Sequence, residues 1–553
     1  MDNNEPVLTP WQRFVSLLRL EKKDIFQIVY YAIFSGLISL TLPLGIQAII
    51  NLIQGAQVST SWVVLVVLVT LGVAFVGILQ LMQLRIIETL QQRIFMRASF
   101  EFAYRFPKIK MEELRNYYPP ELANRFFDVL NVQKGLSKLL IDVPAATLQV
   151  VFALILLSFY HPFFIAFGIL LVVLIYVVFK FTIQKGMVTS IKESKSKYKV
   201  AHWIEEVARA ITSFKLSGKT SLAIDKNDKL VENYLKSREA HFKILILQFM
   251  QMVGFKVSVT AGLLIIGGLL VLNQEMNIGQ FVAAEIIILL IIGSVEKLIL
   301  GLESFYDVLT SLEKLGEVVD KKIEPQDGVS VQTLEDIHVE LDRVCYEVPN
   351  RSVHILHNIS FGISPKSRIL IQGESGSGKS SLLRIIAGVI RPTAGRIFVN
   401  DEALQNIKVN DYRALLGMSL SDETPFEGSI RDNLTFSNAS ISQDEINNAI
   451  EMVGLKKFLK QTERGIDTVI YPEGRQMSFT VAKKIILARA ILKKPKLLIL
   501  EEPLEHFERE EAIEIIKKLT DPENPWALVV VSFNKEWATA CNKVITLKQG
   551  EII

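Results

Sequence analysis

Three long stretches of this chain contain no aspartate, glutamate, lysine or arginine: residues 25–84, 143–179 and 257–274. A helix that crosses a bilayer needs about 20 apolar residues, so the first two stretches are each long enough for two spans and a turn. The turns are expected near residues 54–61 and at 160–162. A third pair of spans is predicted at 242–272 and 278–300. The sequence therefore predicts six membrane-spanning helices within residues 25–320.

Lysine and arginine are concentrated in residues 1–24 and in two long connections, 85–138 and 180–241, and are absent from the three short loops. This asymmetry predicts a multi-pass protein with both termini in the cytoplasm. Residues 1–24 lack a short apolar core with a cleavage site, so we expect the first span to be an uncleaved anchor. Lipid headgroups account for the basic residues beside the spans, and the net charge is only +3, so we expect no nucleic-acid partner.

A glycine-rich octapeptide lies between an apolar run, 368–372, and a helix-like segment, 381–386. Its glycines allow backbone N–H groups to approach phosphate oxygens, Lys379 supplies a positive charge, and the Ser380 hydroxyl is suited to bind Mg²⁺. We expect a charged linker at 321–333 and a nucleotide-binding domain at 334–553. The predicted phosphate loop consists of Gly373, Glu374, Ser375, Gly376, Ser377, Gly378, Lys379, Ser380 and Ser381.

The two long connections are each predicted to be helical and broken once, near residues 117–121 and 217–220. With six spans and a nucleotide-binding domain, the chain resembles the half-transporters of the ABC exporter family. The resemblance implies a multidomain membrane protein: an all-α six-helix transmembrane domain of ABC exporter type, and an α/β P-loop NTPase domain. It also implies coupling helices at residues 120–125 and 210–214, although ordinary solvated helix ends are the alternative at either tip.

A second motif follows the buried-strand pattern at 496–500, which ends in Glu501 and Glu502. Two carboxylates there lie at the carboxyl edge of a parallel sheet, where α/β proteins bind ligands. The segment resembles the family's Walker B strand, which implies that Glu501 holds Mg²⁺ and that Glu502 is the catalytic residue that polarises the attacking water. The family normally has aspartate at the first position, so the longer Glu501 is expected to disturb the octahedral Mg²⁺ geometry.

Other family positions are also altered. The signature, usually Leu-Ser-Gly-Gly-Gln, aligns with residues 477–481, where only Ser478 is retained as a contact to the partner's nucleotide. The glutamine of the loop that senses the γ-phosphate is replaced by Ser421. The switch histidine is replaced by Phe533, which cannot form a hydrogen bond through its side chain. These changes favour ATP binding with weak turnover, with binding alone as the alternative.

The adenine-stacking position holds Val348, which is not aromatic. Tyr346 lies two residues earlier on the same strand face and is the alternative contact to the base.

The resemblance implies an ATP- and Mg²⁺-dependent exporter half that works as a homodimer, or as a heterodimer with a second ABC half, in the bacterial inner membrane. Residues 277–281 look most like exporters of type I secretion systems, which move polypeptides with a periplasmic adaptor and an outer-membrane channel. Since about 24 residues precede the first span, we expect no N-terminal peptidase domain. The competing hypothesis is a non-hydrolysing regulatory or assembly subunit.

One ionisable residue, Glu285, falls inside the sixth predicted span. A carboxyl group at that depth is costly unless it faces a bundle interior or water. It could line a substrate path, or it could be a protonated or hydrogen-bonded glutamate at a helix interface.

Overall fold

The computed structural model describes residues 8–55, 60–332, 334–348 and 354–553. Part of the first expected turn and position 333 of the expected linker therefore lie outside the described residues. The chain forms two compact units. The helical unit comprises Met1–Pro107 and Asn116–Lys321, and the C-terminal unit comprises Lys108–Arg115 and Lys322–Ile553.

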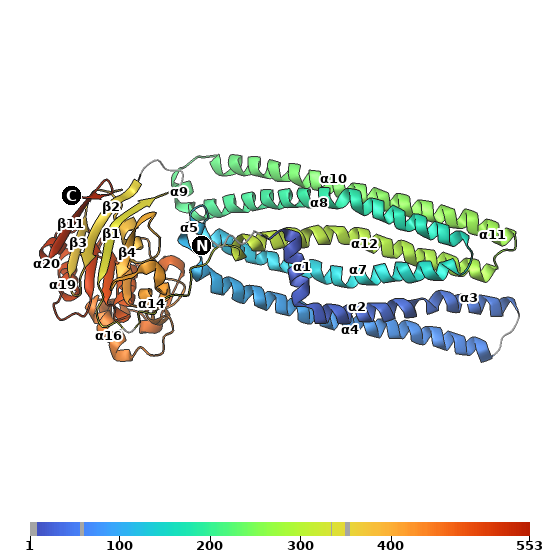
Figure 1. Ribbon diagram of the computed structural model, residues 1–553, viewed down its shortest axis with the longest axis horizontal. Coiled ribbons are helices and arrows are strands. Elements are labelled where there is room, and N and C mark those ends of the chain that lie inside the picture. The colour runs from blue at the N-terminus through green and yellow to red at the C-terminus, as the bar shows by residue number, and fades with distance from the viewer. Residues whose placement is uncertain (1–7, 56–59, 333, 349–353) are drawn as a thin grey trace. The chain divides into compact units, whose positions relative to one another are not determined.

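The helical unit is built from long helices joined by short turns (Figure 1). Their bounds are α1 Pro10–Leu20, α2 Lys22–Ser39, α3 Thr41–Gln54, α4 Thr60–Arg105, α6 Pro119–Ala123, α7 Asp128–Ser158, α8 Phe163–Arg209, α9 Ile211–Leu216, α10 Leu222–Gly262, α11 Gly268–Leu272 and α12 Ile278–Val319. A 3₁₀ turn, Asn124–Phe127, precedes α7, and a π-helical turn, Leu263–Gly267, joins α10 to α11.

Five helical segments of the described chain are long and apolar enough to cross a membrane: Lys22–Gln54, Thr60–Lys108, Pro119–Ser158, Leu222–Leu272 and Ile278–Val319. The remaining expected span corresponds to the start of α8, where Phe163–Val173 is a shorter apolar helix. The expected turns at 160–162 and 273–277 are present between α7 and α8 and before α12. Asn277 caps α12, since its side chain accepts a 2.8 Å hydrogen bond from the Gln280 N–H.

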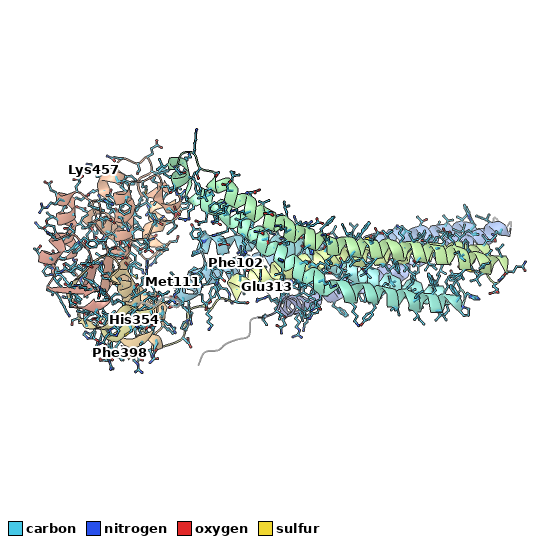
Figure 2. The ribbon with its side chains drawn as sticks, turned by 90° about the horizontal axis from the view of Figure 1, so that it is seen from above. Phe102, Met111, Glu313, His354, Phe398 and Lys457 are labelled. Atoms are coloured by element: carbon cyan, nitrogen blue, oxygen red, sulfur yellow. The ribbon has the colours of Figure 1, made fainter. Side chains whose placement is uncertain are left out.

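Helices distant in sequence lie side by side in this unit. Helix α12 packs along α7, α10 packs along α8, and α2 packs along α4 (Figure 1). The core between α7, α8, α10 and α12 contains Phe164, Met252, Phe255, Ile287 and Ile291, all buried. In Figure 2, Phe102 marks the end of α4 and Glu313 the end of α12.

The C-terminal unit contains two main sheets. The first is antiparallel, in the order β2-β1-β4-β5, with β1 Val339–Glu347, β2 His354–Ile363, β4 Ala394–Val399 and β5 Glu402–Ala403. His354 and Phe398 mark β2 and β4 in Figure 2. The second has the order β12-β11-β3-β10-β9-β6, with β3 Arg368–Gln372, β6 Leu416–Ser419, β9 Leu497–Glu501, β10 Ala527–Val531, β11 Lys543–Lys548 and β12 Glu551–Ile552.

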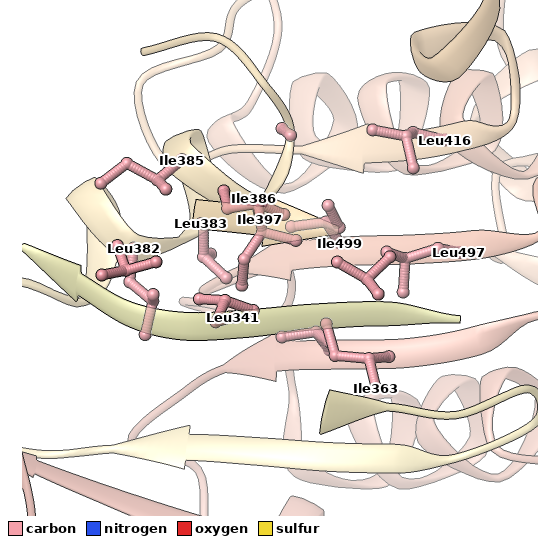
Figure 3. Packing of buried hydrophobic residues seen from close by; sticks show 14 of the residues in the cluster. Leu341, Ile363, Leu382, Leu383, Ile385, Ile386, Ile397, Leu416, Leu497 and Ile499 are labelled. Carbon is pink, nitrogen blue, oxygen red and sulfur yellow. The ribbon is translucent and has the colours of Figure 1, made fainter. Parts of the chain in front are cut away.

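The five strands from β11 to β6 are parallel, and β12 pairs with β11 in the antiparallel direction. The central strands β9 and β10 are buried along their whole length, as the apolar sequence of β10 and of the first four residues of β9 predicts. Helix α13, Lys379–Ile386, packs Leu382, Leu383 and Ile386 into the core between the two sheets (Figure 3). The remaining helices include α15 Ile430–Thr435, α16 Gln443–Met452, α18 Phe479–Leu492 and α19 Arg509–Leu519.

One segment of the first long connection belongs to the C-terminal unit. The short helix α5, Met111–Leu114, lies in the segment Lys108–Arg115. Ile109 forms an antiparallel bridge with Ile323, and the Lys110 N–H donates a 3.0 Å hydrogen bond to the Lys322 carbonyl. The sequence placed all of residues 85–138 in the transmembrane domain, so this assignment differs from the expectation.

Candidate functional site

The phosphate loop occupies the turn between β3 and α13. Gly373, Gly376 and Gly378 all have positive φ angles, of 153°, 82° and 98°. A Cβ atom at Gly373 would lie 2.1 Å from the Leu547 carbonyl oxygen, and one at Gly378 would lie 2.6 Å from the Ile355 carbonyl oxygen. A Cβ at Gly376 would meet nothing within 4 Å. The loop is therefore closed by backbone on two sides and open at Gly376, as a cradle for phosphate requires.

Lys379 begins α13 and folds back over the loop. Its Nζ donates hydrogen bonds of 2.8 Å to the Gly373 carbonyl and 2.7 Å to the Glu374 carbonyl. Burial lowers the pKa of Lys379, and the negative charges of Glu502 and Glu501 act in the opposite direction. The ammonium is thus held against the loop by two of the loop's own carbonyl groups.

Glu501 ends β9 and is 4% exposed. One carboxylate oxygen accepts a hydrogen bond from the Ser380 hydroxyl, and the other accepts a 3.3 Å hydrogen bond from the Ser421 N–H. This carboxylate therefore connects the predicted Mg²⁺ ligand Ser380 to the loop in which Ser421 replaces the family's glutamine.

Glu502 follows with a φ of 41°, a left-handed conformation that is uncommon for glutamate. Its Oε2 accepts a 2.9 Å hydrogen bond from the Ser532 hydroxyl, and its Oε1 accepts a 3.0 Å hydrogen bond from the Phe533 N–H. Burial raises the pKa of Glu502, and Glu505 adds to this, whereas the two hydrogen bonds lower it. The sequence identified Glu502 and Phe533 but not Ser532, which carries no motif of its own.

The Phe533 side chain is exposed, and the Lys379 ammonium lies 5.2 Å from the centroid of its ring. At this distance a cation is attracted to the face of an aromatic ring. The phosphate-loop lysine, the carboxyl group of Glu502 and the altered switch position thus lie together at the carboxyl edge of the parallel sheet.

Ser478 is the N-cap of α18, and its hydroxyl accepts a 3.3 Å hydrogen bond from the Val481 N–H. Phe479 is 46% exposed and its ring lies edge-on to His506 at 5.4 Å. Sequence reasoning missed Lys483 on the same helix: it is buried, and its Nζ donates to the Leu420 and Ser421 carbonyls at 2.9 and 2.7 Å. The sequence around Lys483 does not indicate that its ammonium group will donate to these carbonyls.

Tyr346 lies in the core of the antiparallel sheet and is 5% exposed. Its hydroxyl accepts a 3.0 Å hydrogen bond from Arg115, and the Arg115 guanidinium lies 5.7 Å from the ring centroid. In this structure the ring is covered by the core and by Arg115, and its contact with the base stays a prediction. Val348 is half-buried against the same core.

The two predicted coupling segments are short helices in the helical unit. Residues 120–125 fall in α6 and the 3₁₀ turn after it, and 210–214 fall at the start of α9. The first break is longer than expected, since α4 ends at Arg105. Glu285 lies in α12, half-buried, and forms no hydrogen bond or ion pair with any residue that the structure describes.

The described residues contain no group of three or more histidine, cysteine or acidic side chains that could hold a metal ion by themselves. A Mg²⁺ ion bound mainly by phosphate and water requires fewer protein ligands. Ser380 and Glu501 fit that requirement, because the Ser380 hydroxyl already donates a hydrogen bond to the Glu501 carboxylate.

Comparisons with known proteins agree with this geometry. Residues 25–295 match the model of the ABC transporter transmembrane region, and residues 356–505 match the ABC transporter model. The chain belongs to the ABC transporter family. As an ABC exporter half-transporter, it fuses a helical transmembrane domain to an ABC nucleotide-binding domain.

Relatives of this ABC transporter include secretion proteins. It is 26% identical over 295 residues to the cyclolysin secretion/processing ATP-binding protein CyaB of Bordetella pertussis, a region that covers 53% of this chain and 41% of the relative. It is 25% identical over 353 residues to the alpha-hemolysin translocation ATP-binding protein HlyB of Escherichia coli O157:H7, covering 63% and 50%. The matched region thus spans about half the length of these relatives or less.

Among solved structures, the ABC transporter is similar to a bacterial Atm1-family ABC exporter with ATP bound, with a TM-score of 0.85. The likeness covers 97% of this chain and 95% of that one at 16% identity, so it shows the fold.

Proposed function

We propose that this chain is the ATP-binding half of an exporter that couples nucleotide binding and weak ATP hydrolysis to transport across the bacterial inner membrane. The proposal rests on one contrast. The phosphate loop has the geometry of a working cradle, whereas the proposed base, Glu502, has both carboxylate oxygens engaged by the residues around the altered switch position.

Residues of this chain are proposed to bind the nucleotide first and to support its hydrolysis only weakly. The N–H groups of the loop would donate hydrogen bonds to the phosphates, the Lys379 ammonium would offset part of their charge, and Ser380 and Glu501 would hold Mg²⁺. When bound, Mg²⁺ neutralises charge that develops on the β- and γ-phosphates. Each Glu502 oxygen already accepts one hydrogen bond, so the attacking water would use a remaining lone pair in a carboxylate whose orientation is fixed by Ser532 and Phe533. We attribute weak turnover to this constraint and to the missing imidazole at Phe533.

A dimer would complete each site. The family's sites combine one subunit's phosphate loop with the other's signature, so Ser478 is proposed to contact the partner's nucleotide. Its hydroxyl caps α18, whose N-terminus carries a partial positive charge that favours phosphate. The exposed Phe479 ring is expected to limit how closely a phosphate approaches. The partner is a second copy or another ABC half.

The proposed substrate is a polypeptide. The support comes from relatives such as HlyB and CyaB, whose names describe translocation and secretion. A periplasmic adaptor and an outer-membrane channel belong to the same proposal. Glu285 is proposed to face the substrate path, because it has no hydrogen-bonding partner among the described residues.

A second candidate function is a non-hydrolysing regulatory or assembly subunit that uses ATP to stabilise a dimer. The observation that favours it is the pair of hydrogen bonds on Glu502, which leaves neither of its oxygens unengaged.

The experiment that separates the two is phosphate release by the full chain in lipid nanodiscs, compared with Lys379→Ala and Glu502→Gln. Activity that both substitutions abolish supports the exporter. ATP binding without phosphate release in the unmodified chain supports the regulatory subunit, and absence of ATP binding contradicts both.

A further inference from the structure

A cavity of about 620 Å³ lies in the helical unit among α6, α8, α10 and α12. Lys195 on its wall lies 32 residues after the start of α8. At 1.5 Å per residue this places the cavity about 48 Å along the helix, well beyond a hydrocarbon core about 30 Å thick. The cavity therefore opens to water and lies outside the reach of lipid headgroups.

Arg125 lines the cavity and is 5% exposed. Its Nε donates a 2.9 Å hydrogen bond to Glu317, and its Nη2 donates a 3.1 Å hydrogen bond to Glu121. The guanidinium lies 3.8 Å from the centroid of the Tyr198 ring. Its Nη1 is buried and has no hydrogen-bond acceptor. Leaving a buried charged donor without an acceptor costs about 1–3 kcal/mol or more. Arg125 Nη1 therefore needs an acceptor that the described residues do not supply.

The charge of the cavity wall is unbalanced. Five lysine or arginine side chains line it, against three glutamates. The glutamates already have cationic partners: Glu317 has Arg125 and Lys314, Glu121 has Arg125, and Glu206 has Arg209. The excess positive charge is therefore not neutralised by the wall itself.

Two of the cavity's cations are unpaired. Lys195 and Lys199 are one helical turn apart on α8, so they share a face, and neither forms a hydrogen bond or ion pair with any described residue. The Lys226 ammonium of α10 lies 3.9 Å from the centroid of the Trp203 ring. Lys195, Lys199 and Lys226 therefore line the same cavity as Arg125.

The aromatic rings in the wall are not free to stack on a ligand. The Tyr198 ring lies against the Arg125 guanidinium, and its hydroxyl donates to Asp128. The Trp203 ring lies against Lys226, and its Nε1 donates to the Ala223 carbonyl. A planar base is therefore a poor ligand, whereas a compact anion that gathers several negative charges in one place matches the lysines and Arg125.

We propose that this cavity is a second anion site, distinct from the nucleotide site, which binds a small, multiply charged phosphate anion. Lys195, Lys199 and Lys226 bind its outer oxygens, and Arg125, whose Nη1 lacks an acceptor, lines the same cavity. The inference does not depend on whether the chain hydrolyses ATP.

The test is a calorimetric titration of the full chain in nanodiscs with inorganic tripolyphosphate, without Mg²⁺. Lys379→Ala is present in every sample to weaken binding by the phosphate loop. We expect one site per chain. Lys195→Gln combined with Lys199→Gln should weaken binding about tenfold, since two exposed ionic contacts contribute up to about 1 kcal/mol each and 1.4 kcal/mol is tenfold.

The matched control is Lys192→Gln combined with Lys229→Gln. Lys192 lies on α8, as Lys195 and Lys199 do, and Lys229 lies on α10. Both are exposed, neither lines the cavity, and the two substitutions remove the same charge. The control should leave the affinity unchanged, and both pairs should unfold at the temperature of the parent.

Three results would overturn the proposal: no binding by the parent, equal weakening by both pairs of substitutions, or binding of citrate as tight as that of tripolyphosphate. A polyglutamate peptide that binds where tripolyphosphate does not would identify the cavity as a site for an acidic polypeptide instead.

Discussion

The Ser532 hydroxyl donates a 2.9 Å hydrogen bond to the Glu502 carboxylate and so joins the proposed base to the end of the neighbouring strand β10. The Phe533 N–H holds the other oxygen at 3.0 Å. Two donors from consecutive residues fix the orientation of the carboxylate and favour its charged form against the effect of burial. The position and the pKa of Glu502 are therefore controlled together by the switch segment.

Replacing Ser532 by alanine tests this control. The Ser532 hydrogen bond lowers the pKa of Glu502, so its removal raises that pKa further. A general base must be ionised, and its activity is lost as the pH falls through its pKa. We expect the acidic limb of the pH–rate profile of ATP hydrolysis to move to higher pH in Ser532→Ala and to stay in place in Ser532→Thr. If the acidic limb stayed in place in both variants, Ser532 would not control the pKa of the catalytic base.

Replacing Phe533 by histidine restores a side chain that can hydrogen-bond to a γ-phosphate. A single preorganised contact of this kind contributes about 100-fold to 1000-fold in rate, so we expect kcat to rise at least tenfold. Phe533→Ala is the control, because it removes the ring beside Lys379 without supplying a donor. If both variants hydrolysed ATP at the same rate and faster than the parent, the phenylalanine ring, rather than the absent imidazole, would limit turnover.

Two glycines of the phosphate loop should differ in their tolerance of a methyl group. Both have positive φ, which costs alanine about 1–2 kcal/mol. Only at Gly373 does the added Cβ also meet backbone, 2.1 Å from the Leu547 oxygen. Gly373→Ala should therefore destabilise the C-terminal unit by about 1–3 kcal/mol more than Gly376→Ala, measured by denaturant unfolding. Equal losses would contradict the geometry of the cradle.

Glu285→Gln tests the proposed substrate path. Glutamine retains the size of the side chain and removes its charge, so reduced transport with unchanged ATP binding is expected if the carboxylate contacts substrate. The neighbouring Gln280→Glu is a useful comparison, because it adds a charge at the capped start of α12. Transport at the parental rate by Glu285→Gln would remove this residue from the path.

The sequence predicted the phosphate loop and both acidic residues because their patterns are local: a buried strand, a glycine-rich turn and a helix follow one another within a short segment. The spans were predictable for a similar reason, since a charge-free run of sufficient length has few other structures available. Only the type of side chain at Ser421 and Phe533 could be read in advance. The contacts that replace the lost ones could not be predicted: the Ser421 N–H donates to Glu501, and the Phe533 N–H donates to Glu502.

Contacts between segments that are distant in the chain could not be predicted from the sequence pattern. The Arg391 N–H donates to Glu112, which lies 279 positions earlier in the chain, and no periodicity links the two. Tyr346 illustrates a different limit. Alternation along a strand assigns its side chain to a face, but how deeply the ring is covered depends on the opposing sheet and on Arg115.

The assignment of residues 108–115 to the C-terminal unit has a practical consequence. Because this segment belongs to the C-terminal unit, the polypeptide passes between the two units at three places, after Pro107, Arg115 and Lys321. A gene fragment that starts at Lys322 would lack the strand partner of Ile323 and would leave the Glu324 N–H without the Lys108 carbonyl. A fragment that keeps these contacts must include residues 108–115 together with residues 322–553.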